Sequence, residues 1–416
     1  MNRATPESEF EMLFEDEDTH PHSPPPNGAE AKQQGGLGEW NAGDDDWNIP
    51  PRGWLLKNIF CRGFVSSLLA DGGTGKTAMR VAQLMSLAIG RPLTGEYVFQ
   101  RCRVLILSFE DGRDELRRRV RAAMLHHGVT NADFDGWLFL AALSRQHGKL
   151  METDGKGHLK EGTLAATIKG VIARRGIDIV CFDPFVKTHG VEENSNSAMD
   201  AVIQVLSDMT ADYDIAVDIP HHTAKGASDP GNANRGRGAS AVKDGGRLVY
   251  TLSPMSVEEA QTFGLSEDKR RQLVRMDSAK VNLTPPMTMA KWFRLVDVPL
   301  GNPSTLYPNG DNVQTVEPWT PPDTWAGLNN DLLNRILTEI AAGLPDGNRY
   351  SDGPNATDRA AWRVVQQHAP AKTEGQSREI IKTWVKTGLL VHRGYENPAT
   401  RKTAQGLFVD DAKRPE

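Results

Sequence analysis

The chain has 416 residues, 25% charged and 38% hydrophobic, which suffices for two or three soluble domains, at least one with a sizeable core. No apolar run approaches the roughly 20 residues of a membrane helix, and the N-terminus lacks the basic-then-apolar pattern of a signal peptide, so we expect a cytoplasmic protein. Cys61, Cys102 and Cys181 lack metal-ligand spacing and are expected to be reduced core thiols.

Residues 1–46 form an acidic segment. They hold twelve acidic side chains against Arg3 and Lys32, and their Pro and Gly content predicts a disordered tail. Within the tail, residues 10–18 mix apolar and acidic residues, which fits a solubilising tail, a partner motif or a mimic of DNA phosphates. The other 370 residues carry 46 basic and 42 acidic side chains, a balance compatible with a nucleic-acid partner or with ordinary solvated charges.

Residues 47–297 alternate strand and helix patterns, which predicts an α/β domain with a mostly parallel sheet covered on both faces. The predicted strands are Phe64–Leu69, Arg103–Ser108, Trp137–Leu143, Asp178–Phe182, Asp214–Ile219, Leu248–Leu252, Leu273–Met276 and Trp292–Val296. The predicted helices are Lys76–Ile89, Arg113–His127, Thr163–Arg175 and Ala198–Tyr213.

The segment Ala70–Thr77 lies between the first strand and the first helix and has the pattern of a P-loop. Such a loop curls its backbone N–H groups around phosphate oxygens, and the following helix N-terminus adds a positive dipole. Lys76 would reach the β- and γ-phosphates, and the Thr77 hydroxyl would hold Mg²⁺. Ala70 stands where a glycine is usual, which is tolerable if its φ is negative. The predicted ATP-binding residues are Asp71, Gly72, Gly73, Thr74, Gly75, Lys76, Thr77 and Ala78.

Two later strands end in carboxylates. Glu110 and Asp111 follow one strand and Asp183 follows another, so all three would lie at the edge of the sheet that carries the P-loop. We expect Asp183 to hold Mg²⁺ through water and Glu110 to orient the attacking water, with Asp111 as a competitor for the second role.

The ordered set of motifs resembles one family. The P-loop, Phe109–Asp111 with the arginine-rich stretch 116–119, Asp183-Pro184 and residues 221–225 resemble the RepA-like branch of the RecA superfamily, the plasmid- and phage-type hexameric replicative helicases. Residues 235–247 are similar to the segment before the arginine finger of that family, and 278–282 to its last core motif. The resemblance spans roughly residues 50–297.

The resemblance implies further roles. His222 would sense the γ-phosphate, with His221 as the alternative. Arg247 would be an arginine finger that reaches a neighbouring subunit, with Lys280 as a second candidate. In such rings a loop like 226–238 faces the central channel, so Arg235 and Arg237 would contact DNA phosphates. The alternatives are a strand cap, an ordinary surface arginine and a plain flexible loop.

The C-terminal part has a different pattern. Residues 298–327 are rich in Pro, Asn, Gly and Thr and are predicted to be a linker, and 411–416 a tail. Residues 328–410 are predicted to form a winged helix-turn-helix with helices at Asn329–Ala342, Thr357–His368 and Gln376–Thr387 and a hairpin at Leu389–Val409. Its candidate DNA-binding residues are Arg378, Lys382 and Lys386 on one helix face and Arg393, Arg401 and Lys402 on the wing. Docking of a partner protein and support of an oligomer are the alternatives.

These features predict an ATP- and Mg²⁺-dependent ATPase that forms a homo-oligomeric ring, expected to be a hexamer, and acts as a replicative DNA helicase. A primase section is not evident, so a separate primase or replication initiator would be a partner. The competing readings are an ATP-switched DNA-binding initiator or regulator and a recombination or repair ATPase that forms filaments.

Overall fold

The computed structural model describes residues 39–45, 48–154, 156, 158–193, 195–223, 229–233, 243 and 245–415. The chain divides into two units, Met1–Pro51 and Arg52–Glu416. In the first, the described residues include a short 3-10 helix, Ala42–Asp44, capped by the side chain of Asn41. Most of the predicted acidic tail, including residues 10–18, lies outside the described residues. None of the described helices is both long and apolar enough to cross a bilayer.

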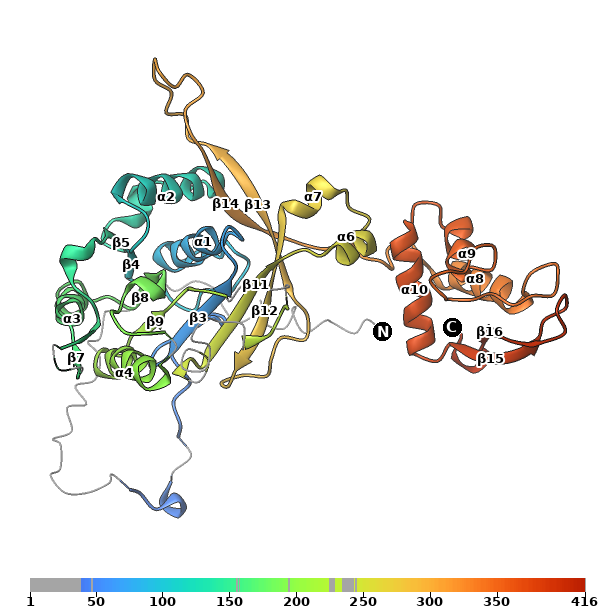
Figure 1. The fold of residues 1–416 in the computed structure, drawn as a ribbon, viewed down its shortest axis with the longest axis horizontal. Coiled ribbons are helices and arrows are strands. Elements are labelled where there is room, and N and C mark those ends of the chain that lie inside the picture. The colour runs from blue at the N-terminus through green and yellow to red at the C-terminus, as the bar shows by residue number, and fades with distance from the viewer. Residues whose placement is uncertain are drawn as a thin grey trace, which may run out of the picture. The chain divides into compact units, whose positions relative to one another are not determined.

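The second unit is built on a ten-stranded sheet with the order β14-β13-β12-β11-β3-β9-β8-β4-β5, in which β10 also pairs with β3 (Figure 1). The strands from β11 to β5 and β10 are parallel, whereas β12, β13 and β14 are antiparallel. The strands are β3 (Val65–Ala70), β4 (Val104–Ser108), β5 (Leu138–Ala142), β8 (Ile179–Asp183), β9 (Ala216–Asp218), β10 (His221–His222), β11 (Leu248–Pro254), β12 (Leu273–Val281), β13 (Lys291–Pro299) and β14 (Asn312–Trp319). Two small antiparallel pairs lie beside it, β1 (Trp54–Leu56) with β2 (Phe60–Cys61) and β6 (Met151–Thr153) with β7 (Leu159–Glu161).

Both faces of the sheet are covered because successive side chains of a strand point to opposite faces. On one face Leu68, Ile106 and Cys181 pack with α1 (Lys76–Ile89) and with Leu116 of α2 (Arg113–His127). On the other, Leu69, Leu107 and Phe182 pack with α3 (Thr163–Arg175) and α4 (Asn196–Tyr213). Cys61, Cys102 and Cys181 are free thiols and buried, as predicted. The predicted α/β fold with a mostly parallel sheet is therefore confirmed.

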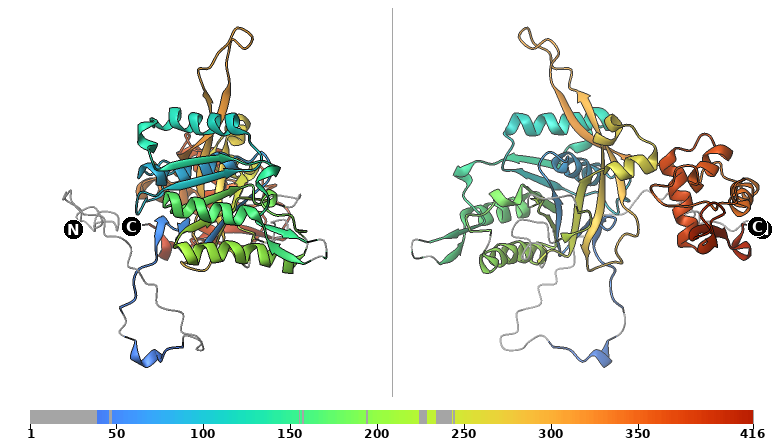
Figure 2. Two further views of the ribbon diagram at one scale, coloured as in Figure 1. Left: turned by 90° about the vertical axis from the view of Figure 1, so that its left-hand side faces the viewer. Right: turned by 45° about the vertical axis from the view of Figure 1, so that its right-hand side comes forward.

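The predicted linker at residues 298–327 is wrong. β13 continues to Pro299, and β14 pairs with it over eight residues and forms the edge of the sheet. The loop of residues 300–311 between them contains two prolines, two glycines and three asparagine or aspartate residues, and this composition conceals the hairpin. Figure 2 shows this loop extending beyond the sheet in both views. The α/β sheet therefore includes residues beyond the predicted domain boundary at 297.

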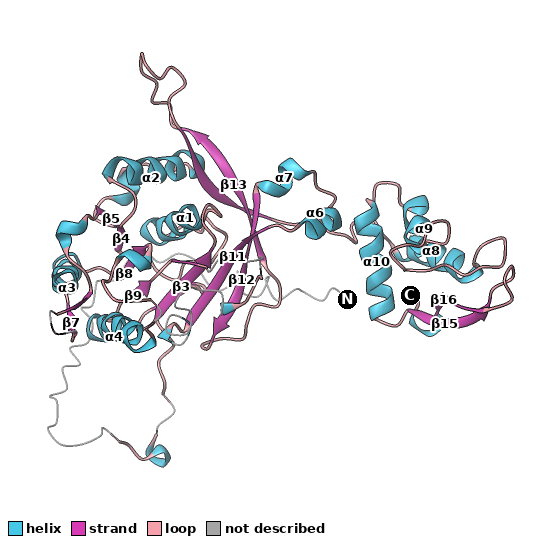
Figure 3. Ribbon diagram, viewed as in Figure 1, coloured by secondary structure: helices cyan, strands magenta, loops and turns pink. Residues whose placement is uncertain are grey.

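The C-terminal elements follow the predicted order. They are α8 (Asn330–Ala342), α9 (Ala361–His368), α10 (Glu374–Lys386), β15 (Leu390–Glu396) and β16 (Thr403–Val409), three helices and then a hairpin (Figure 3). Ile336, Val365, Ile381, Trp384 and Leu407 share one buried cluster. α10 begins two residues before the predicted start, because Thr373 and Gln376 form a capping box.

Two short helices were not predicted, α6 (Val257–Phe263) and α7 (Glu267–Arg271). α6 packs against α10. Gly375 allows this approach, because a side chain there would collide with the carbonyl oxygen of Gln261. The first turn of α10 therefore packs closely against α6.

His189 gives the fold a pH-dependent stability. Its side chain is 5% exposed, it packs on Phe185, and burial lowers its pKa to about 4. The unfolded chain takes up a proton near pH 6.5 that the folded chain resists, so the stability contribution is complete above pH 6.5 and is lost as pH falls toward 4. We expect the free energy of unfolding to drop by up to roughly 3 kcal/mol over this window from His189 alone. Urea unfolding of wild type and His189→Gln at several pH values tests this; equal pH slopes for the two proteins would contradict it.

Candidate nucleotide site

The P-loop connects the end of β3 to α1. Ala70 is the last residue of β3 and buried, so an extended strand residue occupies the position where a glycine is usual, and alanine fits. Gly73 and Gly75 have φ values of +79° and +94°, which side chains disfavour. At Gly75 a Cβ atom would also lie 2.7 Å from Leu295 Cδ2, so glycine is required there for space as well.

Lys76, Thr77 and Asp183 converge where α1 begins. The Thr77 hydroxyl donates a hydrogen bond to Asp183 Oδ2 at 2.7 Å, and Lys76 Nζ lies 4.0 Å from Asp183 Oδ1. Lys76 and Asp183 are 6% and 8% exposed. Burial lowers the pKa of Lys76 and raises that of Asp183, while their mutual attraction opposes both shifts. A hydroxyl and a carboxylate at this spacing form a donor set that fits Mg²⁺.

The two acidic residues after β4 have different surroundings. Asp111 accepts hydrogen bonds from Arg119 Nε at 2.5 Å and Nη2 at 3.3 Å, so α2 holds both of its oxygens. Glu110 is half exposed and pairs with Lys187 Nζ at 3.2 Å. The negative charge of Glu110 also raises the pKa of Lys76 and that of Asp183. Of the two, Glu110 has the more exposed side chain, 47% against 19% for Asp111, and its carboxylate is not held by α2.

The two histidines of β10 also differ. His221 is fully buried and packs edge-on against Phe185, with its ring centroid 5.8 Å away. His222 pairs in register with Ala70, and its Nε2 lies 3.5 Å from Lys76 Nζ. The geometry therefore favours His222 as the residue that contacts a phosphate held by Lys76.

Some neighbours of the P-loop were not predicted from the sequence. The Thr223 hydroxyl donates to Asp71, which ties the start of the P-loop to the end of β10. Leu295 and Gln314, from β13 and β14, lie closest to Gly75. Both also line a cavity of about 400 Å³ with Arg271, Gln272, Arg294, Val296 and Asp297. Because the composition of residues 298–327 is typical of a linker, no sequence pattern indicates this side of the site.

Arg247 lies at the opposite end of the central strands from the P-loop. It precedes β11, where Leu248 pairs in parallel with Ser66 near the start of β3, and its backbone N–H donates to Val65. Its side chain is exposed. Lys280 of β12 pairs with Val249, and its Nζ donates to the Lys243 carbonyl at 2.6 Å. The two finger candidates thus lie near each other and away from the P-loop of their own chain.

The predicted DNA-binding residues divide into two groups. Arg235 and Arg237, with most of the predicted loop 226–238, lie outside the described residues. Those on the C-terminal elements are described: Lys382, Lys386 and Arg393 are exposed, while Arg378 pairs with Glu374 at 2.8 Å and lies over the ring of Trp362. Ile380, Ile381 and Trp384 are buried on the other side of α10. On α10, Lys382 and Lys386 therefore lie on a face of the helix that is open to solvent.

Comparison with known proteins gives two findings. Residues 31–228 match the family model described as an AAA domain, a range that covers slightly less than half of the chain and includes the P-loop, Glu110, Asp183 and His222. The chain is also similar to the crystal structure of a KaiC-like protein from the hyperthermophilic archaeon Pyrococcus horikoshii OT3, with 14% sequence identity over 64% of this chain and 94% of that chain and a TM-score of 0.39. The match to the AAA domain model and the geometry around Lys76 and Asp183 together support ATP hydrolysis at the P-loop.

Proposed function

We propose that the chain is a ring-forming, DNA-dependent ATPase of the replicative helicase type, in which hydrolysis at subunit interfaces drives movement on single-stranded DNA. The observation that carries this proposal is the separation of Arg247 from Lys76. β3 has six residues, and at about 3.3 Å per step between neighbouring residues its two ends lie roughly 17 Å apart. An arginine side chain cannot span this distance, so Arg247 could serve only the nucleotide of a second subunit.

The residues of the chain have separable tasks in hydrolysis. Backbone N–H groups of the P-loop and the α1 N-terminus would bind the phosphates, and Lys76 would neutralise the charge that develops on the β- and γ-phosphate oxygens. Thr77 and Asp183 would hold Mg²⁺, which when bound neutralises further phosphate charge. Leu295 and Gln314 lie beside Gly75 and line the cavity of about 400 Å³, so the base and ribose of ATP would be within reach of this cavity.

Glu110 would orient the attacking water, with Lys187 limiting the directions in which the carboxylate can point. His222 would contact the γ-phosphate and, through β10, pass its presence or loss to the residues that follow Thr223. These residues lead into the segment that the resemblance assigns to DNA contact, so the connection supports coupling between hydrolysis and DNA movement.

A second candidate function is an ATP-switched DNA-binding initiator that does not unwind DNA. It is favoured by one observation. The C-terminal elements have their own hydrophobic cluster, and α10 and β15 expose Lys382, Lys386 and Arg393. In that function the three helices and the hairpin would act as a winged helix that binds a duplex, and the ATPase core would assemble on it.

Unwinding of forked DNA separates the two functions. We expect the wild-type chain to form oligomers with ATP, to hydrolyse ATP faster when single-stranded DNA is added, and to displace the labelled strand. Glu110→Gln should bind ATP and assemble but neither hydrolyse nor unwind. Mass photometry, a phosphate-release assay and a strand-displacement assay provide the measurements. Hydrolysis without displacement would favour the initiator, and a chain that stays monomeric with ATP and DNA would exclude the ring.

A further inference from the structure

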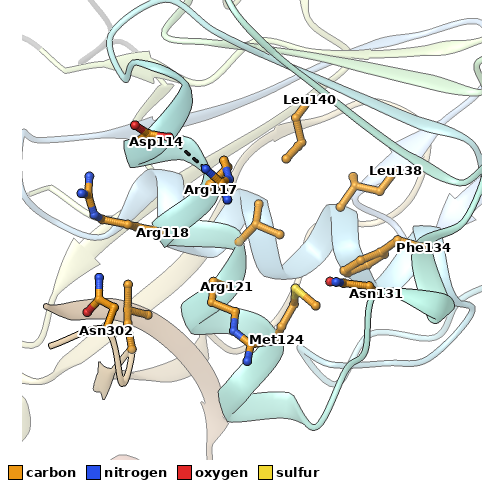
Figure 4. Close-up of a pocket in the computed structure, with 12 residues that line it drawn as sticks. Asp114, Arg117, Arg118, Arg121, Met124, Asn131, Phe134, Leu138, Leu140 and Asn302 are labelled. Carbon is orange, nitrogen blue, oxygen red and sulfur yellow. Dashed lines mark hydrogen bonds and ion pairs between the residues drawn. The ribbon is translucent and has the colours of Figure 1, made fainter. Parts of the chain in front are cut away.

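A groove on α2, separate from the P-loop, has no part in the function proposed above. Its volume is about 770 Å³, and it lies between α2, the sheet strand β5 and the base of the loop between β13 and β14 (Figure 4). Its lining is Asp114, Arg117, Arg118, Val120, Arg121, Met124, Asn131, Phe134, Leu138, Leu140, Leu300 and Asn302.

The floor of the groove is apolar. Val120 and Met124 are buried in the helix–sheet contact, and Phe134 packs against the same cluster. Leu138 and Leu140 are two residues apart on β5, so both point to the face on which the groove lies. Leu140 is 37% exposed, so part of its apolar side chain is in contact with solvent. Apolar side chains of a bound partner would therefore remove this apolar surface from water, which favours binding.

The rim of the groove is basic. Figure 4 shows Arg117, Arg118 and Arg121 around it. Arg118 is held by Asp311 at 3.0 Å, and Arg117 pairs with Asp114 at 3.0 Å although both side chains are about 70% exposed. Within the part of the chain that the structure describes, Arg121 is exposed and forms no ion pair. The rim thus offers two cationic side chains that an anionic occupant can recruit, since an exposed pair such as Arg117–Asp114 is weak.

Among the described residues β5 is the last strand of the sheet, so its outer edge carries backbone N–H and C=O groups that a further strand can pair with. This edge, the apolar floor and the basic rim lie together. Nucleic acid could use the rim, but it would gain little from the leucines and nothing from the strand edge. We propose that this groove binds an acidic peptide segment of a partner protein, one that carries at least two bulky apolar side chains between its carboxylates.

Residues 7–18 of the chain itself have this chemistry, with Phe10, Met12, Leu13 and Phe14 among acidic residues, so a fluorescent synthetic peptide of that sequence is a suitable probe. We expect it to bind the full-length chain and to bind more weakly as salt is raised. A second peptide, with every Glu and Asp replaced by Gln and Asn, should bind at least about tenfold more weakly.

Matched variants locate the binding. The double variant Arg117→Glu/Arg121→Glu should weaken peptide binding at least about tenfold, whereas Arg174→Glu, an exposed arginine on α3, should not change it. Leu140→Ser should weaken it, whereas Leu125→Ser, which is 40% exposed on α2 outside the groove, should not. ATP hydrolysis by each variant reports that it has folded.

Three outcomes would overturn the proposal. One is absence of binding by the acidic peptide, and another is equal binding of the acidic and neutral peptides or of groove and control variants. The third is displacement of the peptide by single-stranded DNA together with loss of DNA binding in Arg117→Glu/Arg121→Glu, which would assign the groove to nucleic acid.

Discussion

Replacing Lys76 with alanine is expected to lower the rate constant of ATP hydrolysis by at least about 100-fold, the loss that follows removal of one charge-stabilising donor from a phosphoryl or acyl transfer site. Lys76 Nζ lies between Asp183 and His222, at 4.0 and 3.5 Å, and its side chain is almost fully buried. Among the described residues, no other lysine or arginine forms an ion pair with Asp183, so no side chain there can take its place. A phosphate-release assay at saturating ATP measures the effect.

Two controls sharpen this test. Lys169→Ala, on the surface of α3 and paired with Glu161, should hydrolyse ATP like the wild type. Lys76→Arg keeps the charge but has to place a planar guanidinium in a space that fits an ammonium group, so it should also lose most activity. Full activity of Lys76→Ala would show that the P-loop is not the hydrolytic site.

The parts of the site that the sequence predicted share one property. Two glycines allow the backbone conformation of the loop, and Lys76 and Thr77 begin the helix that follows it. Both features are local properties of a short segment. Asp183 follows the same logic, because a buried strand that ends in a carboxylate has a known place at the carboxyl edge of a parallel sheet. In the structure Asp183 lies next to Lys76 and Thr77, as its position at the end of a strand predicts.

The contacts that the sequence did not predict depend on residues far apart in the chain. Leu295 and Gln314 lie more than 200 residues after Gly75, and they reach it only because β13 and β14 extend the sheet past its parallel part. β14 itself was missed because it is an edge strand, where Pro318 and the polar Gln314 and Glu317 are tolerated. Propensity and periodicity describe such a strand poorly, since only some of its residues are buried.

Arg80 is a second example. In the sequence it is one basic residue in a helix and would be placed at the surface. In the structure it is 1% exposed and its Nη2 lies 2.9 Å from Oδ1 of Asp218, which is fully buried in β9. The guanidinium also donates to Gln83 at 2.7 Å, and its Cζ lies 5.0 Å from the centre of the Phe60 ring. This ion pair joins the helix that follows the P-loop to the centre of the sheet.

Breaking this pair should destabilise the fold strongly. In Asp218→Asn the buried guanidinium would lose its counter-charge, and we expect the free energy of unfolding to fall by about 3–5 kcal/mol. The Ser66 hydroxyl, which donates to Asp218 at 2.8 Å, also lies 3.1 Å from the Val217 carbonyl, so it keeps an acceptor and adds little to the loss. Urea unfolding followed by tryptophan fluorescence measures the change. Glu396→Gln, which breaks an exposed pair with Arg401, should change it by less than about 1 kcal/mol.

The double variant Arg80→Met/Asp218→Leu decides whether the loss comes from an uncompensated charge or from the removal of a favourable pair. Taking two charges out of water costs about as much as their attraction returns, so an apolar pair of similar volume should recover most of the stability that Asp218→Asn loses. If instead the double variant is as unstable as Asp218→Asn, then hydrogen bonds to Gln83 and Ser66 rather than charge balance hold α1 against β9. The same double variant should still hydrolyse ATP, because within the described part of the chain neither Arg80 nor Asp218 forms a hydrogen bond or ion pair with Lys76, Thr77 or Asp183.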